Sequence, residues 1–302
     1  MNKYTFFLVF LIVLVFSESV SAQVVKVDSV TNWKKSFKGG LNINQAAFSS
    51  NWKGGGINSI GMNMLVNFKA NYKKDKSSWD NEIDLQYGFV RNDGQGFRKT
   101  LDRIFIDTKY GYGISKYWDL YTSLNFLSQF GSGYAYPNDT TESIISDFLA
   151  PAFVTLSLGF EYHPVDYFKL RISPFSPRIT IVRDGARFAP LVDPIRPYGV
   201  DTTETIRTEW LAFQLTADFN KDIAKNINLK WRYLLFANYE TLAMKKIDHR
   251  LDLSLTARVN KFITTSFGVI VLYDFDQDDE VQTSQLLNIG IMYTFQNYED
   301  KK

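Results

Sequence analysis

Charged residues of both signs recur at every second position in several stretches of this 302-residue chain. In one such stretch, Glu82 and Asp84 flank Ile83. A β-strand points successive side chains to opposite faces, so this spacing separates a charged face from an apolar one. If the strands close on themselves, the charges meet inside and must be paired, because an isolated buried charge is costly. Twelve residues are predicted to line such an interior: Lys69, Glu82, Asp84, Arg103, Asp107, Lys109, Arg171, Asp218, Lys230, Arg232, Asp252 and Arg258.

Other reactive side chains are few. The chain has no cysteine, which excludes disulfides, cysteine-ligated zinc and a thiol nucleophile. Its two histidines, His163 and His249, lie in no motif that resembles a lipase, so a Ser–His lipid-processing enzyme is a distant alternative. The acidic stretch 274–280 lacks the glycine of an EF-hand loop and is interpreted as a hairpin tip, with weak cation binding as the alternative. We assign no catalytic, cofactor-binding or metal-binding residue.

The elements that carry these residues are predicted to be strands. Large apolar residues occupy every second position from Leu287 to Phe295, and the same pattern recurs along most of the chain. Short and long connections alternate between the segments, as they do in bacterial outer-membrane barrels. The sequence therefore predicts an all-β protein, a single antiparallel transmembrane β-barrel of about twelve strands with both ends in the periplasm. The predicted segments are 36–48, 57–73, 78–90, 99–114, 117–130, 150–163, 167–182, 208–220, 226–239, 247–259, 262–274 and 282–296.

One predicted strand is irregular. Pro174 and Pro177 interrupt segment 167–182, and proline cannot donate a ladder hydrogen bond. The strand must bulge there or end early. Splitting it would give thirteen strands and an odd count, so we retain twelve.

The ends of the chain fit export. Residues 1–22 resemble a secretory signal peptide, with Lys3 before the apolar run Phe6–Phe16 and a small-residue cleavage site before Gln23. We expect a periplasmic leader at 23–35, the barrel at 36–296 and a short tail at 297–302. We expect the outer face of the barrel to contact outer-membrane lipid. The net charge of +2, with both signs interspersed, argues against a nucleic-acid partner.

The amino-terminal block is the most distinctive motif. It contains Trp33, the run Gly39–Gln45, Phe48, and Asn51-Trp52 followed by Gly54, Gly55 and Gly56. This block resembles the opening of the DUF3078 family, exported proteins of Bacteroidetes-type bacteria without an assigned function. The resemblance implies an outer-membrane β-barrel and supplies no catalytic residues.

Function is less constrained by the sequence than location. We expect a non-enzymatic structural or accessory component of the cell envelope, with a porin-like small-solute channel as the alternative. The carboxy-terminal strand ends in aromatic residues and resembles the signals read by barrel-insertion machinery. The loop 184–207 is the expected surface for an envelope protein partner, because apolar residues in a loop often mark a contact. These residues are Phe188, Leu191, Ile195 and Tyr198.

Overall fold

Alternating apolar and polar residues form long strands, because extended backbone sends neighbouring side chains to opposite faces. The computed structural model describes residues 31–49, 53, 56–136, 141–188, 197–260 and 262–298. The wall strands are β1 Trp33–Ala46, β2 Ser59–Lys74, β3 Ser77–Asn92, β4 Phe97–Gly113, β5 Trp118–Ser128, β8 Ala152–Val165, β9 Phe168–Phe175, β12 Ala212–Ala224, β13 Ile227–Asn238, β14 Asp248–Arg258, β15 Ile263–Asp274 and β16 Asp278–Gln296.

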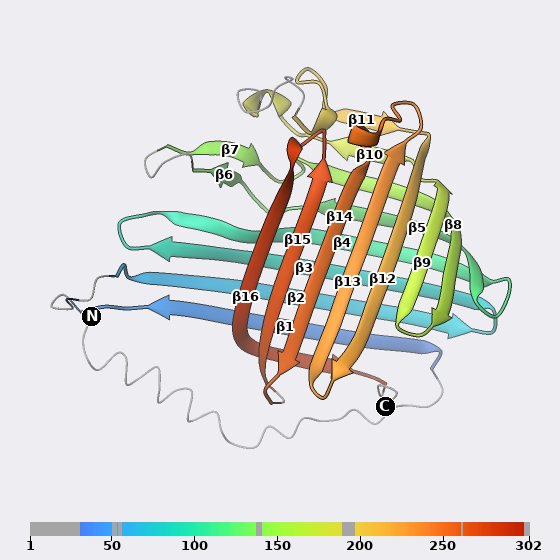
Figure 1. Cartoon of the computed structure of the whole chain (residues 1–302), viewed down its shortest axis with the longest axis horizontal. Helices are drawn as coiled ribbons and strands as arrows, with labels where there is room; N and C mark the ends of the chain where they lie inside the picture. The colour runs from blue at the N-terminus through green and yellow to red at the C-terminus, as the bar shows by residue number, and fades with distance from the viewer. Residues whose placement is uncertain are drawn as a thin grey trace.

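These strands close into a barrel. Each pairs with the next one along the wall, including β8 with β9 and β9 with β12. The last strand then returns to the first, with Ser36 opposite Gln296 and Leu41 opposite Ile291. Figure 1 shows strands β1 to β5 crossing behind strands β12 to β16, so the two halves of the wall face each other. The prediction of an antiparallel twelve-stranded barrel is confirmed.

The wall is apolar outside and polar inside. Leu124 and Ile289 expose 46% and 59% of their surface on the outer face. Ser157 and Glu161 are buried on the inner face. A water-soluble protein would bury the apolar set instead, so this distribution is that of a transmembrane β-barrel.

The connections largely follow the predicted alternation. At one rim β2 joins β3 through residues 75–76, β8 joins β9 through 166–167, and β12 joins β13 through 225–226. The connections 47–58, 129–151 and 239–247 lie at the other rim. The connection predicted to run from 275 to 281 is shortened to 275–277, because the Asp274 carboxylate accepts hydrogen bonds from Asp276 N and Gln277 Nε2 and tightens the turn.

The two prolines end the seventh strand early without changing the strand count. β9 ends at Phe175, and β10 (Arg178–Ile181) begins after Pro177. Both pair with β8, so together they occupy one position in the wall. The eighth predicted strand breaks at the same level, between β11 (Ile206–Glu209) and β12. β11 pairs with β10, and the resulting hairpin continues past the barrel wall.

A cap covers the rim that carries the long connections (Figure 1). It consists of the hairpin β6 (Gly133–Ala135) and β7 (Ser143–Ser146), the hairpin β10–β11, and the 3-10 turns η1 (Gly185–Arg187) and η3 (Pro197–Gly199). A further 3-10 turn, η4 (Met244–Lys246), precedes β14. Among the described residues, no helix is long and apolar enough to cross a membrane.

The cap has its own apolar core. Ala150, Val182, Phe188 and Val200 are buried together, and Tyr198 packs against them. The cap therefore buries its apolar side chains, whereas the barrel wall exposes them on its outer face.

The described chain begins and ends at the rim of the short turns. Strand β1 already begins at Trp33, opposite Tyr72, so the predicted leader 23–35 runs into the first strand. Lys35 N donates to Asn297 Oδ1 at 2.7 Å, and Asn297 N donates to Lys35 O at 3.1 Å. The predicted signal peptide, 1–22, lies outside the described residues.

Candidate functional site

The inner face of the barrel brings most of the predicted lumen charges together. They fall into two chambers stacked along the lumen. The lower chamber lies towards the short turns, and the upper chamber lies beneath the cap. Eight predicted residues line the lower chamber: Lys69, Glu82, Asp107, Lys109, Arg171, Asp218, Lys230 and Arg232. Five line the upper chamber, three of them shared: Arg103, Asp107, Arg171, Arg232 and Asp252.

Two predicted lumen residues line neither chamber. Asp84 still carries polar contacts of the inner face, since it accepts hydrogen bonds from Asn67 Nδ2 at 3.0 Å and Gln86 Nε2 at 2.7 Å. Arg258 is exposed at the last position of β14, and its assignment to the lumen lining is wrong. Its side chain has the inward parity, but the strand ends there and leaves it in solvent at the rim.

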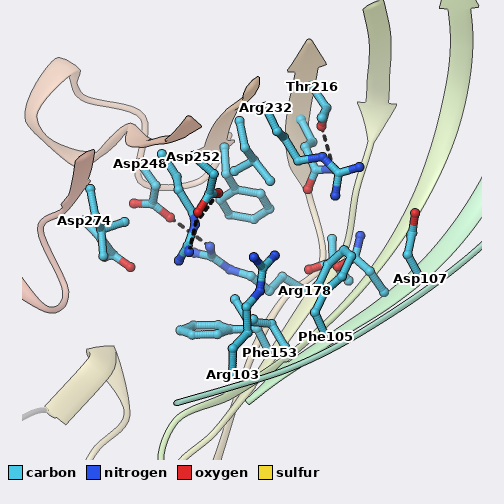
Figure 2. Close-up of a pocket in the computed structure, with 18 of the residues that line it drawn as sticks. Arg103, Phe105, Asp107, Phe153, Arg178, Thr216, Arg232, Asp248, Asp252 and Asp274 are labelled. Carbon is cyan, nitrogen blue, oxygen red and sulfur yellow. Dashed lines mark hydrogen bonds and ion pairs between the residues drawn. The ribbon is translucent and has the colours of Figure 1, made fainter. Parts of the chain in front are cut away.

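A central layer of four side chains separates the chambers: Asp107 on β4, Arg171 on β9, Asp218 on β12 and Arg232 on β13. Arg171 Nη2 lies 2.8 Å from Asp218 Oδ2, and Arg232 Nε lies 2.5 Å from Asp218 Oδ1. Arg171 also approaches Asp107 Oδ2 at 3.8 Å, past the two intervening strands β5 and β8. Figure 2 shows Asp107 and Arg232 approaching the space from separate strands.

The lower chamber measures about 210 Å³ and is crossed by ion pairs. Lys230 on β13 lies 3.9 Å from Glu82 on β3, although these strands lie on opposite sides of the closed wall. Lys69 lies 3.3 Å from the same Glu82 carboxylate. Lys109 and Glu161, both nearly buried, pair at 2.5 Å. Charges from different strands thus hold the opposite walls of the lumen together.

The upper chamber measures about 120 Å³ and has a mixed lining. Arg250 grips Asp252 through two hydrogen bonds of 2.8 Å, and Arg178 Nη1 donates to Asp248 Oδ2 at 2.8 Å. Figure 2 shows these carboxylates on one side, with Arg103 and Phe105 rising from the wall below. The apolar part of the lining comprises Phe105, Leu127, Phe153, Leu234, Phe236 and Leu272.

Arg178 ties the upper chamber to the cap. Its Nε donates to Glu209 Oε2 at 2.8 Å, and its guanidinium lies 3.6 Å from the ring centroid of Phe236. Arg207 reaches from β11 to Asp276 in the connection between β15 and β16. These contacts fasten the β10–β11 hairpin across the mouth of the barrel.

Tyr198 and Asp147 are among the cap groups whose pKa values are shifted. Burial and the nearby Asp274 carboxylate raise the pKa of Tyr198 to about 12, so its hydroxyl stays protonated and donates to Ile145 O at 2.5 Å. Burial alone would raise the pKa of Asp147. Hydrogen bonds from Phe148 N, Arg187 and Ser132 outweigh that effect and lower it.

Sequence reasoning missed several residues of the upper chamber. Asp248 and Arg250 lie four and two positions before Asp252 and share its parity, so following the alternation back to the start of the strand would have found both. Arg178 was hidden by the break at Pro177, because the β10 direction cannot be read across that proline. Asp274 belonged to the acidic stretch interpreted as a hairpin tip, but the structure buries it at the end of β15.

Neither histidine forms a Ser–His pair in the part of the chain that the structure describes. His163 Nε2 lies 3.1 Å from Asp119 Oδ1 without hydrogen-bond geometry. His249 Nδ1 contacts the Tyr233 hydroxyl at 2.7 Å. The residues that the structure describes contain no cluster of three or more acidic or histidine side chains placed to hold a metal ion.

The expected exposure of the apolar residues in loop 184–207 is wrong for Phe188. Phe188 is 1% exposed, because it packs against Ala150, Val182 and Val200 in the cap core. Tyr198 packs against the same core. Leu191 and Ile195 lie outside the described residues. Phe188 is therefore unavailable to a partner while the cap is folded.

Comparison with known proteins gives a family match. Residues 43–134 match the family described as "Protein of unknown function (DUF3078)", which confirms the resemblance over that segment. No curated protein sequence matches the chain.

Several solved structures resemble the chain weakly. An outer membrane channel from Pseudomonas putida F1 has 8% identity and a TM-score of 0.41, covering 88% of this chain and 96% of its own. The translocator domain of the autotransporter NalP from Neisseria meningitidis has 8% identity and a TM-score of 0.39, covering 89% and 91%. The NanC porin has 7% identity and a TM-score of 0.39, covering 85% and 98%. The barrel assignment rests on the strand pairing of this chain itself.

Proposed function

We propose that this barrel, which carries a DUF3078 segment at residues 43–134, is an integral outer-membrane protein with a closed lumen and a non-enzymatic structural or accessory role in the cell envelope. The apolar outer face supports the membrane setting. Phe37, Met64 and Phe68 are each more than a third exposed there, on neighbouring strands β1 and β2. Such a large apolar surface is unfavourable in water but favourable in contact with lipid.

The proposal of a closed lumen rests on the ion pairs that cross the lumen, because their side chains occupy its cross-section. Glu82 and Lys230 join opposite walls, and the central layer lies directly above them. A side chain in such a network is held from several strands and blocks the path between the chambers. The Arg178–Asp248 and Arg207–Asp276 pairs add a second closure at the cap.

Conductance in planar bilayers tests this proposal. We expect the purified wild-type barrel to give no steady openings. A Lys69→Ser, Glu82→Ser, Lys230→Ser triple variant removes the crossing pair together with the second lysine that pairs with Glu82. We expect it to conduct only when the four side chains of the central layer are replaced by serine as well, because that layer separates the two chambers. Steady ion-selective openings of the wild-type protein would contradict the closed lumen.

A small-solute channel is the second candidate. It is favoured by one observation: the two chambers are in line and share the residues of a single layer, Asp107, Arg171 and Arg232. Rearrangement of that layer and of the cap would join them. Wild-type openings whose ion selectivity changes on neutralising Lys230 and Arg232 would establish this candidate in place of the first.

The accessory and non-enzymatic parts of the proposal have separate tests. Affinity pull-down from native membranes is expected to recover an envelope protein at fixed stoichiometry. Assay of the purified barrel with phospholipid vesicles is expected to release no fatty acid, since neither His163 nor His249 has a serine hydroxyl partner among the described residues. Lipid hydrolysis that is lost on replacing either histidine would contradict the proposal.

A further inference from the structure

We propose that the upper chamber is a binding site for a small organic carboxylate with an apolar body about the size of one aromatic ring. A closed structural barrel does not require such a site, so the inference goes beyond the proposed function. Its basis is the side chain of Arg103, which has no ion pair within 4.0 Å and no hydrogen bond at its buried Nε, and which lies beside an apolar wall.

Arg103 differs from the other guanidinium groups of the chamber. Arg171, Arg178, Arg232 and Arg250 each lie within 2.8 Å of a carboxylate oxygen. The Nε of Arg103 is buried and has no hydrogen-bond partner, and its guanidinium stacks over Phe105 at 4.9 Å from the ring centroid.

Asp252 and Asp84 attract the Arg103 guanidinium, but neither lies within ion-pair distance of it, and its buried Nε lacks a hydrogen bond. A buried polar group without a hydrogen bond is costly, and an incoming anion would remove that cost. Asp248 and Asp252 face the same space, but each is already held by an arginine, Asp248 by Arg178 and Asp252 by Arg250. The lining as a whole carries five arginines against four aspartates. The carboxylate is therefore the favoured ligand group, because it matches the planar fork of a guanidinium.

The rest of the lining selects an apolar body. Phe105 and Phe153 lie on the Arg103 side of the chamber in Figure 2. Phe236, Leu127, Leu234 and Leu272 add further apolar surface. The volume of about 120 Å³ is close to the roughly 150 Å³ of an engineered apolar cavity that holds benzene. A one-ring carboxylate such as benzoate therefore fits both the charge and the size.

Fluorine NMR with 4-fluorobenzoate tests the site on the purified, folded full-length barrel in detergent, with empty micelles as the blank. We expect saturable broadening that unlabelled benzoate reverses. 4-Fluorobenzyl alcohol and 4-fluorobenzylamine match the ring but lack the anion, and we expect neither to compete. Equal binding of all three probes, or no saturable binding of the benzoate, would overturn the proposal without any variant being made.

Arg103→Gln then localises the binding. We expect its affinity for 4-fluorobenzoate to fall roughly tenfold or more, as loss of a charge-assisted contact to a carboxylate predicts. Arg258→Gln is the matched control, since it removes the same charge from an exposed position outside both chambers. The gel shift on heating confirms that each variant is folded. Unchanged affinity in Arg103→Gln, or an equal loss in Arg258→Gln, would refute the assignment.

Discussion

The two chambers of the lumen are built from similar residues but satisfy their charges differently. In the lower chamber Lys69, Lys109 and Lys230 each lie within 4.0 Å of a carboxylate oxygen contributed by another strand. In the upper chamber Arg103 has no such partner, and six of the twenty lining residues are apolar. The charges of the lower chamber therefore connect different strands of the barrel through ion pairs. In the upper chamber, Arg103 is left able to bind an anion. Each prediction below breaks or sharpens this difference.

Removing the closing strand is expected to have the largest effect, because both chambers need a closed wall. β16 pairs with β15 on one side and with β1 on the other. Deleting Leu287–Phe295 would leave two open sheet edges, so we expect no membrane insertion. Cell fractionation and the gel shift on heating would measure this. Normal insertion of the truncated chain would contradict both the pairing and its role in assembly.

Removing a charged side chain is expected to lower the stability of the barrel in the lower chamber. In the upper chamber, removing Arg103 is expected to leave the stability unchanged or to raise it. Lys109→Met leaves Glu161, which is 3% exposed, without its 2.5 Å partner. Breaking a buried pair costs roughly 3–5 kcal/mol when the remaining charge is left alone. Because Lys169 still lies 3.9 Å from Glu161, we expect a loss of stability at or below this range. Arg103→Met removes a buried cation that has no hydrogen-bond partner at Nε, so we expect an unchanged or higher stability.

Urea unfolding in lipid vesicles, followed by tryptophan fluorescence, compares these two variants. Equal destabilisation would remove the distinction between the chambers. A larger loss in Arg103→Met would mean that this residue braces the wall, as the lower lysines do.

The outer and inner faces of the same strand are expected to tolerate arginine differently. Leu253 lies on the outer face of β14, opposite Trp231 on β13. Leu253→Arg should cost about 2–4 kcal/mol if the residue lies near the bilayer midplane. Thr256→Arg is a suitable inner-face control, because its cross-strand neighbours Asn228 and Ser266 are uncharged. Thr216 would be a poor control, since it is 3% exposed and shares its chamber with Arg171 and Arg232.

Folding yield into vesicles and urea midpoints report both changes. A similar cost for Leu253→Arg and Thr256→Arg would contradict the assignment of the lipid-facing side.

Much of the barrel could be predicted because its determinants are local. Alternation at residues such as Glu82 and Ile83 fixes which side chains face inward, since the strand period is two. What alternation cannot give is the partner of each charge. Lys230 meets Glu82 only because the wall closes with β3 and β13 on opposite sides, which is a property of the whole barrel.

The cap was the least predictable part for a related reason. Phe188 reads as an exposed loop residue until Val182 and Val200 come together around it, and this contact joins segments without regular strand pattern. Pro177 hid Arg178 by ending the alternation from which its direction could be read. Side chains on irregular backbone near the upper chamber could therefore not be placed from the sequence, whereas those on the regular strands of the lower chamber could.

The smallest expected effect concerns pH and the cap. Asp147 Oδ2 accepts from Arg187 Nη1 at 3.0 Å, and its other oxygen accepts from Phe148 N at 2.8 Å. The pKa of Asp147 in the folded cap is lowered, so its contribution to stability is present above the unfolded pKa and is lost as pH falls through the folded pKa. Because Arg187 is 42% exposed, we expect less than about 1 kcal/mol from the ion pair.

Methyl NMR of Val182 and Val200 monitors the cap core through an acid titration. Wild-type protein should show the packed resonances above the unfolded pKa of an aspartate and lose part of that population at lower pH. Asp147→Asn cannot ionise, so its cap should be loosened already at neutral pH and should change little on acidification. Asp184→Asn is the control, since Asp184 lies 3.7 Å from the same arginine but is 56% exposed. A wild-type acid profile in Asp147→Asn would show that other groups hold the cap, and that it does not depend on the Asp147 contacts to Ser132, Phe148 and Arg187.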